Sequence, residues 1–361
     1  MIASLLAALR EQPAYAGLVE RDLVGLPATG TAHGHVRLPD GLLARIAYAH
    51  EGDPSAAARL ATQAVAFRHL APARRTPRLH AVIEPRAGLP GGALIVDYVE
   101  GRAPDLPSEL SALADTLARL HGLPLPEPGS PIPRQRNPFL ETLEAVELAA
   151  ARFLDKAVTD PAARAEIVEE LQLMRGMAST LATRAQPLTV ALADTHPGNF
   201  IVDRAGIAWF VDLEKVHVGS SAIDLAHATL PTSTLWDPKV GKSLSRAEVE
   251  GFYAVYLATV GKAQAEALEP WLLPMRRLTW LRTMLFMARW RVQTRSLRDP
   301  SDPSQWSDAG LDPAFRGIDQ RNRIAGQHGE MLCRLGKRHA AGAAGKAAVG
   351  VHRNAVLRRC R

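Results

Sequence analysis

The sequence predicts an α+β fold in two lobes, a small β-rich N-terminal lobe over residues 1–100 and a larger, mainly helical C-terminal lobe over residues 101–330. Up to residue 100, short apolar runs are separated by turn-forming residues, which is typical of strands. Beyond residue 100, apolar residues recur every three or four positions over long stretches, which is typical of helices. With 361 residues, 47% of them hydrophobic, the chain can bury a full core.

The N-terminal lobe is expected to begin with a helix that is broken at Pro13. A loop rich in small residues follows, and it leads into two short strands around a Pro-Asp-Gly turn, the pattern of a hairpin. The expected segments are, in order, a helix over 4–24, a loop over 25–34, strands over 35–38 and 42–48, a helix over 54–71, and strands over 79–83 and 93–99.

The C-terminal lobe is expected to be helical apart from a short β region near its middle. Thr159 or Asp160 is expected to cap a new helix where the long helical tract is interrupted. The expected segments are, in order, a helix over 108–120, a Pro-rich link over 124–138, a helical tract over 140–184, strands over 188–192 and 207–211, and a helix whose apolar stripe runs from Leu278 to Val292.

The segment 194–199, Asp-Thr-His-Pro-Gly-Asn, joins the two strands of this β region, and the second strand ends at Asp212. Asp194 and Asn199 are thus separated by four residues in one loop, with a second Asp after the next strand. Phosphoryl transfer needs this layout, because one carboxylate orients the attacking hydroxyl while a carboxamide and another carboxylate hold magnesium on the ATP phosphates. The alternative is an ordinary turn, since Asp and Asn both favour turns.

These motifs, with the Val-Asp-Leu-Glu run at 211–214, resemble the aminoglycoside phosphotransferase / choline kinase-like family of small-molecule kinases. The family pattern is His-Gly-Asp-Leu-His-Pro-Gly-Asn, followed by Ile-Asp-Trp-Glu. Leu192 and Ala193 replace the family's His-Gly, and the family His braces the catalytic loop rather than reacting. The resemblance implies a bilobed protein-kinase-like fold and transfer of the γ-phosphoryl group of ATP, with Mg²⁺, to a hydroxyl of a small molecule.

The resemblance also assigns expected roles to individual residues. Asp194 would be the catalytic residue, and Asn199 and Asp212 would hold magnesium. Arg45, in the second strand of the hairpin, would contact the nucleotide phosphates unless it is an outward-facing strand residue. The remaining nucleotide contacts would come from the backbone of a lid loop over 30–34, with Gly30 and Gly34, and from the main chain at Asp97 and Val99, beside the adenine.

Two departures from the family pattern support a competing hypothesis, a non-catalytic nucleotide-binding pseudokinase or regulatory protein. Leu192 is one, and the other is Gln63, which stands where the family has a Glu that pairs with the strand cation. Gln63 cannot form an ion pair, but it can hydrogen-bond Arg45. Retention of the catalytic Asp and both metal ligands argues for an enzyme.

Two features of the C-terminal lobe leave alternatives open. Asp224 either caps a helix or, as in the family, braces the catalytic loop. The helix that follows Pro270 carries several arginines, among them Arg276, Arg277 and Arg282, and no acidic residue up to Arg298. It is either a core helix with a solvated basic face or the wall of a site for an anionic substrate.

The net charge of +6 arises from the end of the chain, because residues 331–361 carry eight positive charges and no acid. This tail is expected to be disordered, and nucleic acid would be contacted only weakly, through the tail. Two cysteines do not make a disulfide framework and fit a reducing compartment. No basic signal-peptide start and no membrane-spanning apolar run are evident, so a cytoplasmic location is expected.

Overall fold

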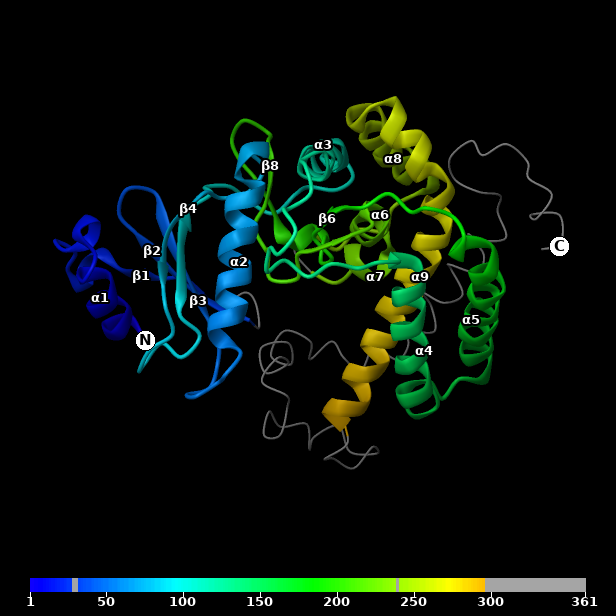
Figure 1. Cartoon of the computed structure of the whole chain (residues 1–361), viewed down its shortest axis with the longest axis horizontal. Coiled ribbons are helices and arrows are strands. Elements are labelled where there is room, and N and C mark those ends of the chain that lie inside the picture. The colour runs from blue at the N-terminus through cyan, green and yellow to red at the C-terminus, as the bar shows by residue number, and fades with distance from the viewer. Residues whose placement is uncertain (28–31, 238–239, 296–361) are drawn as a thin grey trace.

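The computed structural model describes residues 1–27, 32–237 and 240–295. The chain forms two lobes side by side, with the N-terminal sheet at one end of the molecule and the helices at the other (Figure 1). The elements of the N-terminal lobe are α1 (Ile2–Arg10), β1 (Val24–Gly25), β2 (His33–Leu38), β3 (Leu42–Ala47), α2 (Ala56–Leu70), β4 (Leu79–Ile83) and β5 (Ala93–Asp97), with short 3-10 turns at Pro13–Tyr15, Glu20–Asp22 and Ala71–Ala73.

The predicted hairpin is the centre of the N-terminal sheet. The sheet is antiparallel, in the order β1-β2-β3-β5-β4. Asp40 and Gly41 make the turn with positive φ angles of 56° and 69°, a conformation that Asp and Gly tolerate better than most residues. β2 starts two residues earlier than expected, so Gly34 lies in the strand, opposite Ile46, and not in the preceding loop.

The two faces of this sheet bury their side chains against different partners, as the alternation of a strand requires. Ala93 and Ile95 face α1, whose Leu5 and Leu9 complete a small apolar cluster. The neighbouring residues of β5, Leu94 and Val96, belong to the main core, to which α2 also contributes. Figure 1 accordingly shows α1 on the outer side of the sheet and α2 between the sheet and the helical lobe.

The leading helix is shorter than expected. It ends at Arg10, and the 3-10 turns and β1 take the place of its predicted second half. Pro13 lacks the amide hydrogen that would continue the helix. The break at this proline was predicted, whereas helix over the residues that follow it was wrong.

The C-terminal lobe is built mainly from helices, and two short sheets lie among them. Its elements are α3 (Leu110–His121), α4 (Pro138–Ala157), α5 (Pro161–Ala182), β6 (Thr189–Ala191), β7 (Phe200–Val202), β8 (Ala208–Phe210), β9 (His217–Gly219), α6 (Ser221–Thr229), α7 (Pro231–Thr234), α8 (Arg246–Val260) and α9 (Lys262–Arg295), with a 3-10 turn at Pro197–Asn199. β6 pairs with β9, and β7 pairs with β8. As predicted, Asp160 caps α5 by accepting from the backbone amides of Ala162 and Ala163.

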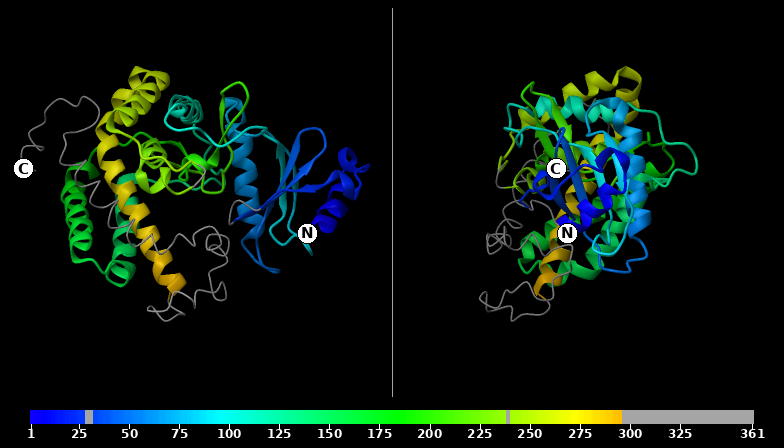
Figure 2. Two further views of the ribbon diagram at one scale, coloured as in Figure 1. Left: turned by 180° about the vertical axis from the view of Figure 1, so that it is seen from behind. Right: turned by 90° about the vertical axis from the view of Figure 1, so that its left-hand side faces the viewer.

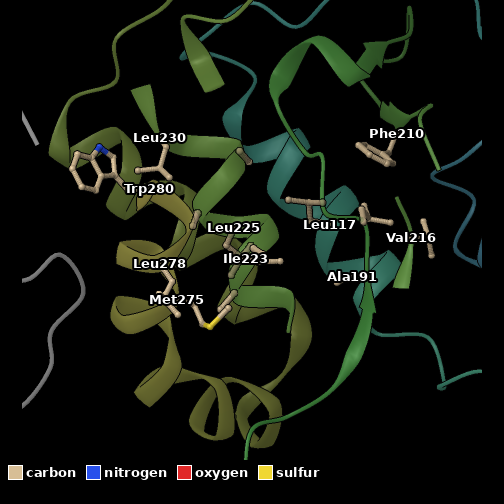
Figure 3. Close-up of a cluster of buried hydrophobic side chains, with 14 of the residues drawn as sticks. Leu117, Ala191, Phe210, Val216, Ile223, Leu225, Leu230, Met275, Leu278 and Trp280 are labelled. Carbon is tan, nitrogen blue, oxygen red and sulfur yellow. The ribbon is translucent and has the colours of Figure 1, made fainter. Parts of the chain in front are cut away.

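The long helix α9 organises the core of this lobe. It packs against α4, α5, α6 and α8, and its passage beside the other helices is visible from behind in Figure 2. The predicted apolar stripe is buried, with Leu278, Leu281 and Leu285 at most 1% exposed. Figure 3 shows Leu225 of α6 between Leu117 of α3 and Leu278 of α9.

Some sequence expectations fall outside the described residues. Gly30 does, and so do the end of the predicted C-terminal lobe, over 296–330, and the basic tail over 331–361. Among the helices that are described, none combines the length and the apolar character required to cross a bilayer.

Candidate active site

The segment 194–199 forms a compact loop between β6 and β7, and its own hydrogen bonds fix its shape. Asn199 Nδ2 donates to the backbone carbonyl of Asp194 at 2.8 Å, and the backbone amide of Asn199 donates to His196 at 2.9 Å. The amide of Val211 then donates to the carbonyl of Asn199 at 3.1 Å. These bonds bring Asp194 and Asn199 together and set Asp212, the next residue after Val211, beside them.

Asp224 braces this loop from α6. Its fully buried carboxylate accepts from the backbone amides of Leu192 and Ala193, both at 2.7 Å. The hydroxyl of Thr195 donates to the backbone carbonyl of Asp224 at 2.7 Å. The cap of α6 is instead Ser220, whose side chain accepts from Ala222. Of the two roles left open for Asp224, the structure therefore shows the brace.

A second layer of buried polar groups holds Asp224. His121, at the end of α3, contacts the Asp224 carboxylate through Nε2 at 2.9 Å and the Tyr256 hydroxyl through Nδ1 at 3.0 Å. His121 and Asp224 are at most 2% exposed. The loop is thus held where the amides of Leu192 and Ala193 donate to Asp224, which is itself paired with the buried His121. Leu192 replaces the family His and contributes through its backbone amide.

Ala193 occupies a strained backbone conformation immediately before Asp194. Its φ is +64°, in the left-handed region that costs an L-residue about 1–2 kcal/mol. The hydrogen bond from its amide to Asp224 and one from Arg282 Nη1 to its carbonyl, at 3.3 Å, hold it there. A Gly, which the family pattern has here, would adopt this φ without that cost.

Asp194 lies among basic groups. Its Oδ2 is 2.5 Å from Lys215 Nζ, and its Oδ1 is 3.8 Å from His227 Nδ1. Burial opposes ionisation of Asp194, but the Lys215 ammonium together with His196 and His227 outweighs it and holds the pKa of the carboxyl below its usual range. Burial lowers the pKa of His227 to about 3, so this imidazole is neutral. Asp194 is therefore an ionised carboxylate with one oxygen held by Lys215.

Arg45 crosses from the N-terminal sheet to the catalytic lobe. Its Nη2 is 3.0 Å from Asp212 Oδ1, and its Nη1 donates to the carbonyl of Val211. The residue is 5% exposed, so the alternative of an outward-facing strand arginine is wrong. Among the described residues, the hydrogen bond that Gln63 could make to Arg45 is absent, and the guanidinium binds Val211 and Asp212.

The oxygen donors near Asp212 fit magnesium, which prefers hard oxygen ligands. Because Asn199 Nδ2 is committed to the Asp194 carbonyl, the carboxamide oxygen is the atom left for an ion. Asp212 also clusters with His33 and Glu214, with one possible ligand atom of each lying within 4.8 Å of the others. Burial, followed by the Asp212 carboxylate, raises the pKa of Glu214 to about 7.

The residues expected to meet the nucleotide base lie at the junction of the lobes. Asp97 ends β5, and its carboxylate accepts from the Arg78 amide at 2.9 Å and contacts His80 at 2.6 Å. Its side chain is thus engaged in the sheet, and so is its backbone amide, which donates to the carbonyl of Arg78 at 3.0 Å. Val99 lies two residues further on, in the linker to the helical lobe. Gly34, in β2, packs so close to Tyr48 that a Cβ would lie 3.2 Å from its hydroxyl.

The arginines of α9 divide between the core and the catalytic loop. Arg276 donates to Thr229, and Arg277 forms a two-pronged ion pair with Glu170. Arg282 instead donates to the carbonyl of Ala193, directly before the segment 194–199. The contacts of Arg276 and Arg277 therefore join helices within the helical lobe.

Two residues at the site were missed from the sequence, Lys215 and His227, and Arg282 was named only as one arginine of a possible substrate wall. Lys215 directly follows the Asp-Leu-Glu run, so its position next to the motif was a signal. His227 lies three residues after Asp224, one turn further along the same helix. Arg282 is far away in sequence, and only the packing of α9 brings it to the loop.

Comparison with known proteins agrees with this geometry. Residues 40–269 match the phosphotransferase enzyme family. A comparison with the curated proteins found no match.

Solved structures show the same fold at low sequence identity. A choline/ethanolamine kinase family protein from Mesorhizobium loti is 18% identical, with a TM-score of 0.53 over 93% of this chain and 98% of that one. The GDP complex of aminoglycoside 2'-phosphotransferase-IIIa is 12% identical, with a TM-score of 0.58 over 93% and 99%. A macrolide 2'-phosphotransferase from Brachybacterium faecium is 16% identical, with a TM-score of 0.53 over 81% and 93%. The fold is the protein-kinase-like fold of these enzymes.

Proposed function

Because the chain belongs to the phosphotransferase enzyme family, a family of small-molecule kinases, we propose that it transfers the γ-phosphoryl group of ATP to a hydroxyl of a small molecule in a magnesium-dependent reaction. The solved relatives support nucleotide use, since one of them is a GDP complex. They also support a small-molecule acceptor, since their names include choline, ethanolamine and aminoglycoside. We place the reaction in the cytoplasm, which fits a chain of 361 residues with two cysteines.

One observation carries the proposal: an ionised carboxylate, a carboxamide and a second carboxylate meet in one braced loop region. Asp194 and Asn199 are joined by the 2.8 Å hydrogen bond, and Asn199 is joined to the residue before Asp212 by the 3.1 Å bond. Phosphoryl transfer depends mainly on positioning and electrostatics. A loop fixed by so many internal bonds supplies the positioning.

In the proposed mechanism Asp194 orients the acceptor hydroxyl. Its low pKa is no obstacle, because a loose transition state lets the base take the proton late. Asn199 and Asp212 would hold magnesium through their side-chain oxygens. When bound, this ion neutralises charge on the phosphate oxygens. The acceptor would thus bind at Asp194, and the metal would bind at Asp212.

Arg45 would serve the nucleotide phosphates from the other lobe. In the structure its guanidinium is bound to Asp212 and Val211, so it would have to exchange partners when a nucleotide enters. The main chain at Asp97 and Val99 would hold the adenine edge, and the backbone of the glycine-bearing segment with Gly30 and Gly34 would cover the phosphates. These assignments extend the family's pattern to this chain.

A second function is favoured by one observation. The ion pair of 3.0 Å between Arg45 and Asp212 partly neutralises a carboxylate that a kinase needs for its metal. A protein that binds nucleotide for regulation, without turnover, would tolerate this pair. The two functions differ in whether phosphate is transferred.

The test is transfer of phosphate from labelled magnesium-ATP into a mixed pool of hydroxylated metabolites. We expect a labelled product with the wild-type protein and a loss of at least about 1,000-fold in Asp194→Ala, a typical scale for a positioned base and its loop. Asp155→Ala is the matched control, because the Asp155 side chain is 87% exposed on α4. Magnesium-dependent ATP binding without transfer to any acceptor would favour the regulatory protein.

A further inference from the structure

Lys215 bridges the two acidic ends of the candidate site. Its Nζ is 2.5 Å from Asp194 Oδ2 and 3.7 Å from Glu214 Oε1. Asp194 marks the acceptor end, and Glu214 belongs to the cluster around Asp212 that marks the metal end. The ammonium therefore lies between the groups that would hold the acceptor and the groups that would hold the metal.

Lys215 also differs from the two arginines of the site. The guanidinium of Arg45 binds the Val211 carbonyl, and that of Arg282 binds the Ala193 carbonyl, so both are tied to the backbone. The hydrogen bond of Lys215 goes to a side chain, and 47% of its side chain is exposed. An ammonium on a four-carbon stem can change partners without disturbing the catalytic loop.

The charge state of Lys215 suits an anion. Burial works against the ammonium, but the carboxylates of Asp194, Glu214 and Asp212 together outweigh it and raise the pKa of Lys215 above its usual value. The residue is therefore a full cation at neutral pH. Lys215 also covers Oδ2 of Asp194, which leaves Oδ1 as the oxygen that faces away from the ammonium.

We propose that Lys215 is a further catalytic residue, which binds the γ-phosphoryl oxygens of the nucleotide while the group moves toward the acceptor. This role rests on the proposed function. The acceptor oxygen forms its bond to phosphorus as the bond from phosphorus to the β–γ bridging oxygen breaks, and the electron pair of that bond leaves with ADP. The hydroxyl proton passes to Asp194 Oδ1, and Lys215 keeps its own proton throughout.

The test compares nucleotides that differ at the γ position, so it needs no knowledge of the acceptor. Affinities for the magnesium complexes of ADP and of the β,γ-imido analogue of ATP are measured by titration calorimetry. We expect Lys215→Met to weaken binding of the analogue by about 10- to 100-fold, the scale of one hydrogen bond to a charged group, and to leave ADP binding within about twofold. Lys215→Arg keeps the charge and is expected to restore part of the loss.

A second experiment separates direct binding of the γ-phosphoryl oxygens by Lys215 from a role in which Lys215 only neutralises the charge of Asp194. In the neutralising case, Lys215→Met weakens the analogue only because Asp194 is left as an uncompensated negative charge. The same substitution is therefore made in an Asp194→Asn background, where that charge is gone. Direct binding predicts that the analogue is still weakened at least fivefold relative to Asp194→Asn alone. No further loss in this background would overturn the proposal.

Lys262→Met is the matched control, because the Lys262 side chain is 87% exposed at the start of α9. Circular dichroism and thermal unfolding check that each variant is folded. Equal weakening of ADP and analogue, or no weakening of either, would overturn the role of Lys215 while the proposed function stands. A wild-type protein that binds neither nucleotide would instead overturn the proposed function, and this role with it.

Discussion

The buried brace on the catalytic loop gives a prediction whose size follows from its contacts. Substitution Asp224→Ala removes the acceptor of three hydrogen bonds, from Leu192 N, Ala193 N and His121 Nε2. All three donors are buried. A buried donor left without a partner costs about 1–3 kcal/mol, so three such donors would cost about 3–9 kcal/mol together. We expect a loss of about 4 kcal/mol in the free energy of unfolding.

The loss is measured by equilibrium urea unfolding at pH 7. Ser220→Ala is the matched control, since Ser220 is buried on the same helix and its side chain accepts one bond, from Ala222. Loss of such a helix cap costs about 1 kcal/mol. Asp224→Ala should also lower phosphate transfer, because Ala193 would no longer be held in its left-handed conformation. If Asp224→Ala is no more destabilising than Ser220→Ala, the brace does not exist as described.

Two further predictions concern Glu214 and Arg277. The pKa of Glu214 is raised to about 7 from an ordinary value of 4.5, so folding favours its protonated form, and its contribution to stability is lost as the pH rises through about 7. Glu214→Gln should therefore gain stability over the wild type between pH 4.5 and 7, and the gain should reach about 3 kcal/mol above pH 7. The measurement is thermal unfolding of both proteins across this range. A stability difference that does not change with pH would contradict the raised pKa of Glu214. Arg277→Met breaks the ion pair with Glu170, in which both side chains are at most 21% exposed. It should lower the free energy of unfolding in urea by about 2 kcal/mol and leave phosphate transfer unchanged. Lost transfer at unchanged stability would instead make Arg277 part of the substrate wall.

Local sequence patterns were enough to predict most of the N-terminal sheet and the position of the loop over 194–199. The hairpin was predicted from two apolar runs around a Pro-Asp-Gly turn, and both strands are present. The loop over 194–199 was predicted because the residues of its motif are consecutive in the sequence. The short strands β7 and β9 and the helix α8 were not predicted. Strands of three residues carry little periodic signal, and their stability comes from partners elsewhere in the chain.

The groups around Asp194 were harder to predict because they come from separate elements. His227 lies on α6 and Arg282 on α9, and their approach depends on how these helices pack. The hydrogen bond that Gln63 could make to Arg45 is absent among the described residues for the same reason. Phe67, four residues along α2, lies against the guanidinium at 5.6 Å, and the polar contacts of Arg45 lie in the other lobe. The positive charge of Arg45 could be read from the sequence, but its partners are determined by the tertiary structure.

The apolar core has a consequence for how the two lobes behave together. One continuous cluster includes Leu60 and Phe67 of α2, Val96 of β5, Leu117 of α3 and Leu281 of α9. The face of the N-terminal sheet that carries Val96 thus shares its interior with the helical lobe. Because such a shared interior cannot be separated without exposing it to water, the two lobes form one cooperative unit in unfolding. Opening of the site to admit a nucleotide is then limited to small shear movements along packed side chains, and a wide hinge motion would break the core.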